Sequence, residues 1–504
     1  MKKVIHMMKL THISLIEEKT GRSLISGLDL VINQNSKLAI IGEEGNGKSS
    51  LLHVIRNRQD LIPYLQVEGK IDSIYQTIGY LNQSLDAEKS DLIVADLFEE
   101  VTWDNLLIEA MEAFQIDNLF STQRYADLSG GEKLKYQLLA ILATNPEILL
   151  LDEPTNNLDL NGIEWLETFI KQLSIPVIFV SHDEAFIQAT ANELLHLELT
   201  KKNQVPLYTL SKDDFYIYKE KREKAITTHN LQVKNEQRAL KKQETKLRDV
   251  WNKAEHQHTQ VSRADPRLQK KVKSLKQQKE KLATQKDNVQ DIRTIEEQPT
   301  FFFAPVSSPK KKQLILDLDL PVLENEKGVL AKDIHLPIFT QDKLIITGEN
   351  GVGKSTLIRK VNETLQQQSK YKIGFMPQNY EEVIDLSKSV LEVLNTGESN
   401  EEQRIRTLLA NLNFTRDEML HAVNELSGGQ QAKILLVKLM LEENDVLILD
   451  EPTRNLSPLT NQFFYDALSE YQGTVIAISH DRKFISSLDE KQLYELTVGG
   501  LNSQ

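Results

Sequence analysis

The chain has 504 residues, of which 40% are hydrophobic and 26% charged, so a protein of two or three globular domains is expected. Cysteine is absent, which excludes disulfides, thiolate metal sites and cysteine nucleophiles and fits a reducing, cytoplasmic location. The formal net charge of −13 argues against nucleic acid as a partner of the whole surface, but residues 221–285 hold 18 Lys and Arg against 7 Asp and Glu, a local charge of +11.

The N-terminal segment MKKVIHMMKLTH has the lysines of a secretory leader, but His6, Lys9 and His12 interrupt the apolar stretch that should follow them. Other apolar runs, such as ILLL at 148–151, fall far short of the ~18 residues that a membrane-spanning helix needs. We therefore expect neither a signal peptide nor a membrane domain.

Residues 1–205 alternate short apolar runs with amphipathic stretches. KLAIIG, EILLLD and PVIFVSH predict buried parallel strands, and EKLKYQLLAILATN predicts a crossover helix, which together indicate an α/β fold. The loop GEEGNGKS at 42–49 follows the first of these strands and precedes a helical stretch. In this context the pattern GxxxxGK[ST] predicts a phosphate site, with N–H groups facing the phosphates, Lys48 reaching the outer ones and Ser49 supplying an oxygen to Mg²⁺.

Four further polar motifs follow: IGYLNQ ending at Gln83, LSGGEK from Leu128, LLLDEP with Asp152 and Glu153, and FVSH ending at His182. Alternation along a strand should point Asp152 and Glu153 to different sides, so that one holds a metal ion and the other addresses water. Taken alone, SGG before a helix is also a common cap, and a single His is more often structural. The functional interpretation therefore depends on the complete set.

The same five motifs recur in the same order in the second part of the chain. The offsets between equivalent residues are 306 for Lys48 and Lys354, 295 for the two glutamines, and 298 for the other three motifs. Such a register indicates duplication of a whole domain. We place a first copy at 1–205, a linker at 206–311 and a second copy at 312–504.

The linker has a seven-residue apolar repeat instead of the α/β rhythm. It consists of Ile226, Val233, Leu240 and Leu247 and then of Leu268, Leu275, Leu282 and Val289. This repeat predicts an antiparallel helical hairpin, with a first helix of ~60 Å over about 212–252, a tip near 253–265 and a second helix from Asp265–Pro266. A solvated spacer is the plain alternative, but a spacer needs no excess of cations, so we expect an arm that faces phosphates.

The complete set of motifs resembles the ATP-binding cassette family in both copies, and the resemblance implies two tandem P-loop cassettes that bind ATP and Mg²⁺ head to tail within one chain. Site one would be formed by Gly42, Glu43, Glu44, Gly45, Asn46, Gly47, Lys48, Ser49, Gln83 and Asp152 together with Ser427, Gly428 and Gly429. Site two would be formed by Gly348, Glu349, Asn350, Gly351, Val352, Gly353, Lys354, Ser355, Gln378 and Asp450 together with Ser129, Gly130 and Gly131. The implied Mg²⁺ ligands are Ser49, Gln83 and Asp152 in one site and Ser355, Gln378 and Asp450 in the other, and the implied catalytic residues are Glu153, His182, Glu451 and His480.

Two departures from the family pattern concern the sites themselves. Asp159 of EPTNNLD matches the family's aspartate that reaches the partner's phosphate loop, whereas EPTRNLS has Ser457 there, so the two sites should hydrolyse ATP at different rates. The segments EKTG (18–21) and NEKG (325–328) contain no aromatic residue where the family stacks adenine. A preference for ATP over GTP is therefore implied by the family alone.

The absence of membrane-spanning segments leaves four kinds of cassette protein as candidates. A transporter ATPase subunit usually has one cassette and no basic arm, a chromosome or repair ATPase has its coil inside the cassette, and the iron-sulfur ribosome-recycling protein needs cysteines. The chain is most similar to the ABC-F type, whose linker enters the ribosome toward the P-site tRNA and the peptidyl-transferase centre. Ser457 and the short stretch of 44 residues between Gln83 and Leu128 resemble the antibiotic-resistance members more than the housekeeping translation factors.

The resemblance implies that the linker contacts rRNA and tRNA phosphates through Arg238, Lys241, Lys242, Lys246, Arg248, Lys270, Lys271, Lys273 and Lys276. Near the tip, Trp251 is expected either to stack on a base or to pack between the helices.

Overall fold

The computed structural model describes residues 7–18, 21–43, 45–56, 65–82, 92–98, 101–128, 130–156, 158–199, 206–260, 273–279, 281, 303, 312–325, 328–395, 401–412, 414–456 and 458–503. The chain forms two compact units, one of residues 1–215 with 298–504 and the other, which we call the arm, of residues 216–297. Glu44, Gln83, Ser129, Ser457 and most of the predicted return helix, with Asp265, Pro266, Leu268, Lys270, Lys271, Leu282 and Val289, lie outside the described residues.

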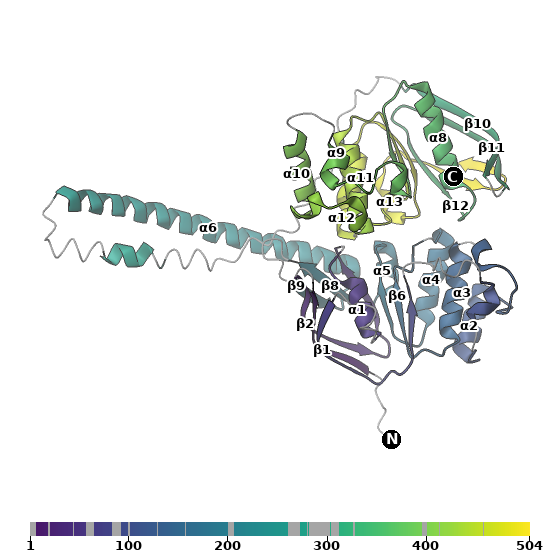
Figure 1. Ribbon diagram of the computed structural model, residues 1–504, viewed down its shortest axis with the longest axis horizontal. Helices are drawn as coiled ribbons and strands as arrows, with labels where there is room; N and C mark the ends of the chain where they lie inside the picture. The colour runs from purple at the N-terminus through teal and green to yellow at the C-terminus, as the bar shows by residue number, and fades with distance from the viewer. Residues whose placement is uncertain are drawn as a thin grey trace. The chain divides into compact units, whose positions relative to one another are not determined.

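The first copy, whose strands β6, β8 and β9 are labelled in Figure 1, is built on a six-stranded sheet in the order β5-β6-β7-β3-β8-β9. Its strands are β5 (Ile78–Leu81), β6 (Ile148–Asp152), β7 (Val177–Val180), β3 (Lys37–Gly42), β8 (Glu193–Leu199) and β9 (Pro206–Ser211), all parallel except β9. The helices are α1 (Lys48–Ile55), α2 (Asn105–Phe114), α3 (Gly130–Leu142), α4 (Leu160–Gln172) and α5 (Glu184–Thr190). Strands β3, β6 and β7 are wholly buried, as their continuous apolar sequences predict for a sheet covered on both faces.

The second copy repeats this design in the order β13-β14-β15-β12-β16-β17. Its strands are β13 (Ile373–Met376), β14 (Val446–Asp450), β15 (Thr474–Ile478), β12 (Lys343–Gly348), β16 (Gln492–Thr497) and β17 (Gly500–Ser503). The helices are α8 (Lys354–Gln368), α9 (Val390–Leu394), α10 (Glu401–Asn411), α11 (Gly428–Leu441), α12 (Pro458–Glu470) and α13 (Arg482–Ser487). The predicted α/β fold with two tandem cassettes is confirmed.

Each copy also has antiparallel strands that the sequence patterns did not predict. In the first copy β1 (Met7–Glu17) lies between β2 (Ser23–Asn33) and β4 (Leu65–Ser73), and in the second copy β10 (Leu314–Asn325) pairs with β11 (Gly328–Phe339). Their inner side chains, among them Leu28 in the first copy and Ile334 in the second, are buried in the same apolar clusters as the phosphate-loop helices. These antiparallel strands therefore pack against α1 and α8, the helices that follow the phosphate loops.

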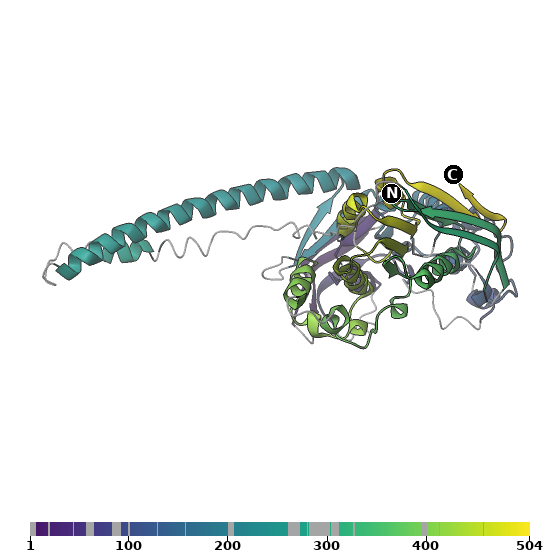
Figure 2. The same ribbon diagram turned by 90° about the horizontal axis from the view of Figure 1, so that it is seen from above.

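The arm contains one long helix, α6 (Phe215–Gln260), beside which residues 273–279 form a helical segment (Figures 1 and 2). Of the predicted apolar repeat, Ile226, Val233 and Leu275 are buried and Leu240 and Leu247 half-buried. Leu247, Val250 and Leu275 line one groove, so the two segments pack through apolar side chains. The long first helix is confirmed, but its expected end near 252 is wrong, because α6 continues through the first part of the predicted tip. No helix in the described part of the chain is long and apolar enough to span a membrane.

Candidate active site

The two phosphate loops lie where parallel strands end and helices begin, and glycine conformations shape them. Gly47 and Gly353, which cap α1 and α8, have φ of 81° and 104°. Gly42 and Gly348 have φ of 148° and 140°, and a Cβ on either would lie 2.3 Å from a carbonyl oxygen of the neighbouring strand. Only glycine fits these positions, so the loops keep their backbone N–H groups turned inward, as phosphate binding requires.

The lysines of both loops are buried and folded back over their own loops. Lys48 Nζ donates to the carbonyl oxygens of Gly42 and Glu43 at 2.8 and 3.0 Å, and Lys354 Nζ donates to those of Gly348 and Glu349 at 2.8 and 2.9 Å. Each ammonium group thus lies inside the curl of the loop, where a chain of phosphates would meet it.

A hydroxyl and a carboxylate from different elements meet beside each loop. Ser49 Oγ on α1 donates to Asp152 Oδ1 at the end of β6, 3.1 Å away. Burial raises the pKa of Asp152 and of Asp450, and the hydroxyls of Ser49 and Ser355 partly oppose that rise. Such oxygen donors suit Mg²⁺, and a bound cation would compensate for burying the carboxylate, so these residues fit the predicted metal site. Gln378 lines the same cavity as Ser355 and Asp450.

The two candidate base residues have an unusual backbone. Glu153 and Glu451 both adopt φ of 50°, in the left-handed region that side chains other than glycine rarely occupy. Strands β6 and β14 end at Asp152 and Asp450, so the glutamates lie outside the strands. Strand alternation, which was expected to separate the two carboxylates of each pair, therefore does not extend to the glutamates. Strained conformations of this kind cluster at functional sites.

Each glutamate contacts the histidine that follows the neighbouring strand. Glu153 Oε2 accepts a hydrogen bond from the His182 backbone N–H at 3.1 Å, and its Oε1 lies 3.0 Å from His182 Nε2. In the second copy the corresponding distances to His480 are longer, 3.4 and 3.6 Å. Burial, with a nearby lysine ammonium, lowers the pKa of both histidines to about 3, so both imidazoles are neutral at pH 7. The backbone N–H groups of the two histidines hold the glutamates, and the imidazoles do not act as cations.

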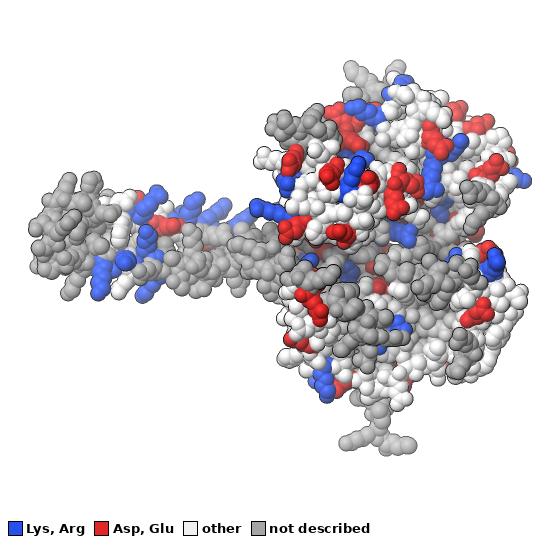
Figure 3. Space-filling model, viewed as in Figure 1, with Lys and Arg blue, Asp and Glu red and all other residues white. Residues whose placement is uncertain are grey.

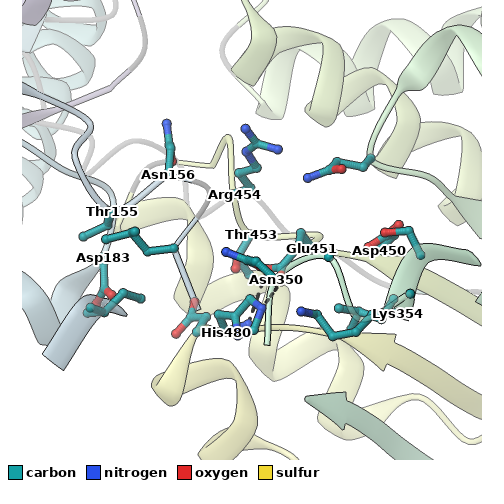
Figure 4. Close-up of a pocket in the computed structure, with 18 of the residues that line it drawn as sticks. Thr155, Asn156, Asp183, Asn350, Lys354, Asp450, Glu451, Thr453, Arg454 and His480 are labelled. Atoms are coloured by element: carbon teal, nitrogen blue, oxygen red, sulfur yellow. Dashed lines mark hydrogen bonds and ion pairs between the residues drawn. The ribbon is translucent and has the colours of Figure 1, made fainter. Parts of the chain in front are cut away.

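A cavity of about 350 Å³ at site two is lined by both copies (Figure 4). The second copy contributes Lys354, Ser355, Gln378, Asp450, Glu451 and His480, and the first copy contributes Thr155, Asn156, Leu158, Ile163, His182 and Asp183. Glu451 Oε1 and both ring nitrogens of His480 are buried without a hydrogen-bond partner among the described residues, which fits a cavity that takes a polar ligand. Burial and the neighbouring carboxylate of Asp450 raise the pKa of Glu451.

The contact predicted for Asp159 is present. Its Oδ2 accepts a hydrogen bond from the N–H of Asn350, in the phosphate loop of the other copy, at 3.3 Å. Of the predicted LSGG residues of the first copy, Gly131 is described and is not among the residues that line this cavity. Asn325 and Leu330 line the cavity, but no Phe, Tyr or Trp does so among the described residues. The cavity therefore offers no aromatic ring from these residues on which a base could stack.

At site one the copies meet through an ion pair that the sequence analysis missed. Lys433 on α11 of the second copy lies 3.1 Å from Glu43 in the first phosphate loop, and the two side chains are only 6% and 10% exposed. Ser427 caps the same helix through a reciprocal pair of hydrogen bonds with Gln430, so the LSGG segment has the capping role considered for it. In the first copy the equivalent Lys135 instead donates to the Phe114 carbonyl at 3.4 Å.

Changing Asp159 to Ser tests the role of the carboxylate at site two. Serine still offers an oxygen to the Gly162 N–H that Asp159 now caps at 2.8 Å, so α4 should keep its stability. In a Glu153→Gln background, where site two carries the turnover, we expect Asp159→Ser to lower the single-turnover rate several-fold with an unchanged melting temperature. An unchanged rate would show that the Asn350 contact has no kinetic role.

The comparisons with known proteins agree with this geometry. A family model described as ABC transporter matches residues 25–156 and 331–454, half of the chain. ATP-binding protein Uup of Buchnera aphidicola is 33% identical over 94% of this chain and 78% of its own length, and ribosome protection protein VmlR of Bacillus subtilis is 28% identical over 98% and 87%. A structure titled as a model of ribosome-bound archaeal Pelota and ABCE1 matches with a TM-score of 0.60 and 13% identity over 97% of this chain and 78% of that one, a likeness of fold alone. The chain therefore belongs to the ATP-binding cassette family, as a tandem-cassette ATPase of the ABC-F type.

Proposed function

We propose that the protein is a cytoplasmic Mg²⁺-dependent ATPase whose ATP-bound form closes its two copies on each other and binds the ribosome through the arm. The observation that carries the ATPase part is the meeting of residues from both copies around Lys354, Glu451 and Asp159. Hydrolysis to ADP and phosphate would remove the ligand that joins the copies and so release the ribosome.

The catalytic roles follow from the positions of the side chains. Lys48 and Lys354 neutralise phosphate oxygens, and Ser49 with Asp152 and Ser355 with Asp450 would hold Mg²⁺, which stabilises the charge on the phosphates when bound. Glu153 and Glu451 orient the attacking water and accept its proton, while the backbone N–H groups of His182 and His480 hold these carboxylates.

The arm supports an RNA partner. Its exposed cations among the described residues are Lys221, Lys224, Lys234, Arg238, Lys241, Lys242, Lys246, Arg248, Lys273, Lys276, Lys279 and Lys281, several of which are visible in Figure 3. The exposed acids there are Glu220, Glu223, Glu236, Glu244 and Asp249. An excess of cations over anions along a narrow rod suits contact with the phosphates of rRNA and of P-site tRNA.

Of the two roles considered for Trp251, packing is better supported. The side chain is half-buried, and Lys279 Nζ from the return segment lies 5.8 Å from the centre of its ring. This cation-π contact joins the two segments of the arm.

Within this function we favour protection of translation from ribosome-targeting antibiotics, because Ser457 replaces the acidic residue and the ribosome protection protein VmlR aligns over nearly the whole chain. A housekeeping translation factor is the second candidate, favoured by the 33% identity to Uup. Expression in a susceptible strain separates them: protection predicts raised inhibitory concentrations for drugs of the peptidyl-transferase region with the native chain, and none with a Lys48→Ala/Lys354→Ala variant.

Co-sedimentation tests ribosome binding directly. The Glu153→Gln/Glu451→Gln variant with ATP should pellet with 70S ribosomes at low ionic strength. The control is Lys48→Ala/Lys354→Ala, which should stay in the supernatant because it lacks the cations that hold the phosphates. If the Gln variant binds ATP but stays in the supernatant, the proposed function is wrong.

A further inference from the structure

Helix α13 of the second copy meets α4 and α5 of the first copy through two ion pairs. Arg482, the first residue of α13, pairs with Glu167 on α4. Lys483, the next residue, pairs with Glu184 at the start of α5, with Nζ and Oε2 2.5 Å apart. Both cations come from the second copy and both anions from the first.

The anions of these pairs are shielded from water. The Glu184 side chain is 2% exposed and that of Glu167 is 12% exposed, whereas Lys483 and Arg482 are 25% and 34% exposed. A carboxylate buried to this degree is strongly destabilising unless a cation faces it. Each ion pair therefore affects the pairing of the copies mainly by disfavouring a partner that places an anion or a neutral side chain against the buried glutamate.

The duplication did not preserve these charges. At the offset of 298 that relates His182 to His480, Glu184 corresponds to Arg482, and Ala185 corresponds to Lys483. By the same offset, Glu167 on α4 corresponds to Tyr465 on α12. The start of the helix is thus acidic in one copy and basic in the other, and the two versions of this helix face each other, since α5 and α13 are in contact.

Pairing of like copies would consequently bring like charges together. If a first copy met another first copy in this arrangement, Glu184 would face Glu167, and Ala185 would supply no cation. If a second copy met another second copy, Lys483 would face Arg482. Asp183 and Asp481 cap the two helices, and after burial the nearby Asp481 carboxylate helps to raise the pKa of Asp183, so a pairing of two first copies would add the charge of Glu184 to carboxylates that already lie close together.

We propose that Arg482 and Lys483, with Glu167 and Glu184, are specificity residues that allow the first copy to pair only with a second copy. They exclude closed pairs made of two identical copies from different chains, which the shared motifs at the phosphate loops would otherwise permit. The ion pair between Lys433 and Glu43 lacks this property, because both copies keep a lysine and a glutamate at those positions. The inference concerns pairing of the copies and is independent of ribosome binding.

The test measures closure of the isolated full-length chain without ribosomes. Because the chain has no cysteine, Glu109→Cys on α2 and Gln366→Cys on α8 introduce two unique labelling sites, both exposed. In the Glu153→Gln/Glu451→Gln background, spin-label distances with ATP report the closed fraction. Arg482→Glu with Lys483→Glu should reduce the ratio of closed to open molecules by about tenfold or more. Adding Glu167→Arg and Glu184→Lys should restore that ratio to within about threefold of the parent.

Three further measurements make the outcome decisive. Arg482→Gln with Lys483→Gln should give an intermediate ratio of closed to open molecules. Reversal of the exposed ion pair within α10, by Glu402→Arg with Arg406→Glu, should leave that ratio unchanged. Circular dichroism identifies any variant that has not folded. The inference is overturned if the acidic α13 variant closes like the parent, or if the four-residue exchange closes no better than the two-residue reversal.

Discussion

Replacing Glu153 and Glu451 together by Gln is expected to lower ATP turnover by about 10²–10⁴-fold, the usual contribution of a general base. Glutamine keeps the size of the side chain and can still accept from the N–H of His182 or His480, so the pockets should stay assembled. The amide cannot take a proton from water, and so bound ATP should persist. Phosphate release under steady-state conditions measures the loss, and a filter assay with radiolabelled ATP should show retained binding.

The single variants report on each site separately. Glu153→Gln leaves only site two able to hydrolyse ATP, and there Asp159 contacts Asn350. Glu451→Gln leaves only site one able to do so, and there Lys433 contacts Glu43. We expect unequal single-turnover rates, because these contacts differ and the glutamate lies closer to its histidine in the first copy. Glu363→Gln, an exposed change on α8, is the matched control. Equal rates in the two single variants would contradict functional asymmetry.

Neutralising the arm should weaken ribosome binding strongly and change its salt dependence. Replacing Arg238, Lys241, Lys242, Lys246 and Arg248 by Gln removes five exposed cations from α6 and none from the apolar repeat. If each contacts a phosphate, the slope of log affinity against log salt should fall by roughly one per residue. For five contacts this corresponds to a loss of about two to three orders of magnitude in affinity near 0.1–0.2 M salt.

A matched set of substitutions separates this effect from net charge. Lys332, Lys360, Lys370, Lys372 and Lys388 are exposed lysines of the second copy, and changing all five to Gln alters the total charge equally. Ribosome pelleting at several salt concentrations should show a reduced slope for the arm variant alone. Equal slopes for the two variants would mean that the arm makes no specific phosphate contacts, whereas ATPase activity without ribosomes should be unaffected in both.

The sequence predicted the central parts of both copies because local patterns determine them. Runs such as LAII and LILD become fully buried strands, and the polar residues directly after those strands necessarily meet at one edge of the sheet. The glycines and lysines of the phosphate loops were recognisable for the same reason, since their spacing alone defines the loop. The apolar repeat of the linker likewise identified α6 and its buried face.

Contacts between distant parts of the chain could not be predicted in this way. The pairs that join Lys433 to Glu43 and Lys483 to Glu184 cross about 300 to 390 residues, and their geometry depends on how the copies meet. A signal was nevertheless present in the motifs, because SHDE in the first copy becomes SHDR in the second. The end of α6 was misplaced because no proline or glycine interrupts residues 253–260, and polar composition alone does not end a helix.

The left-handed backbone at Glu153 and Glu451 lowers the stability of the fold at the two residues proposed to activate water. A residue other than glycine costs roughly 1–2 kcal/mol in this conformation, so a glycine at either position would make the fold more stable while it removed the proposed proton acceptor. Selection for heat tolerance alone would therefore tend to discard these two glutamates.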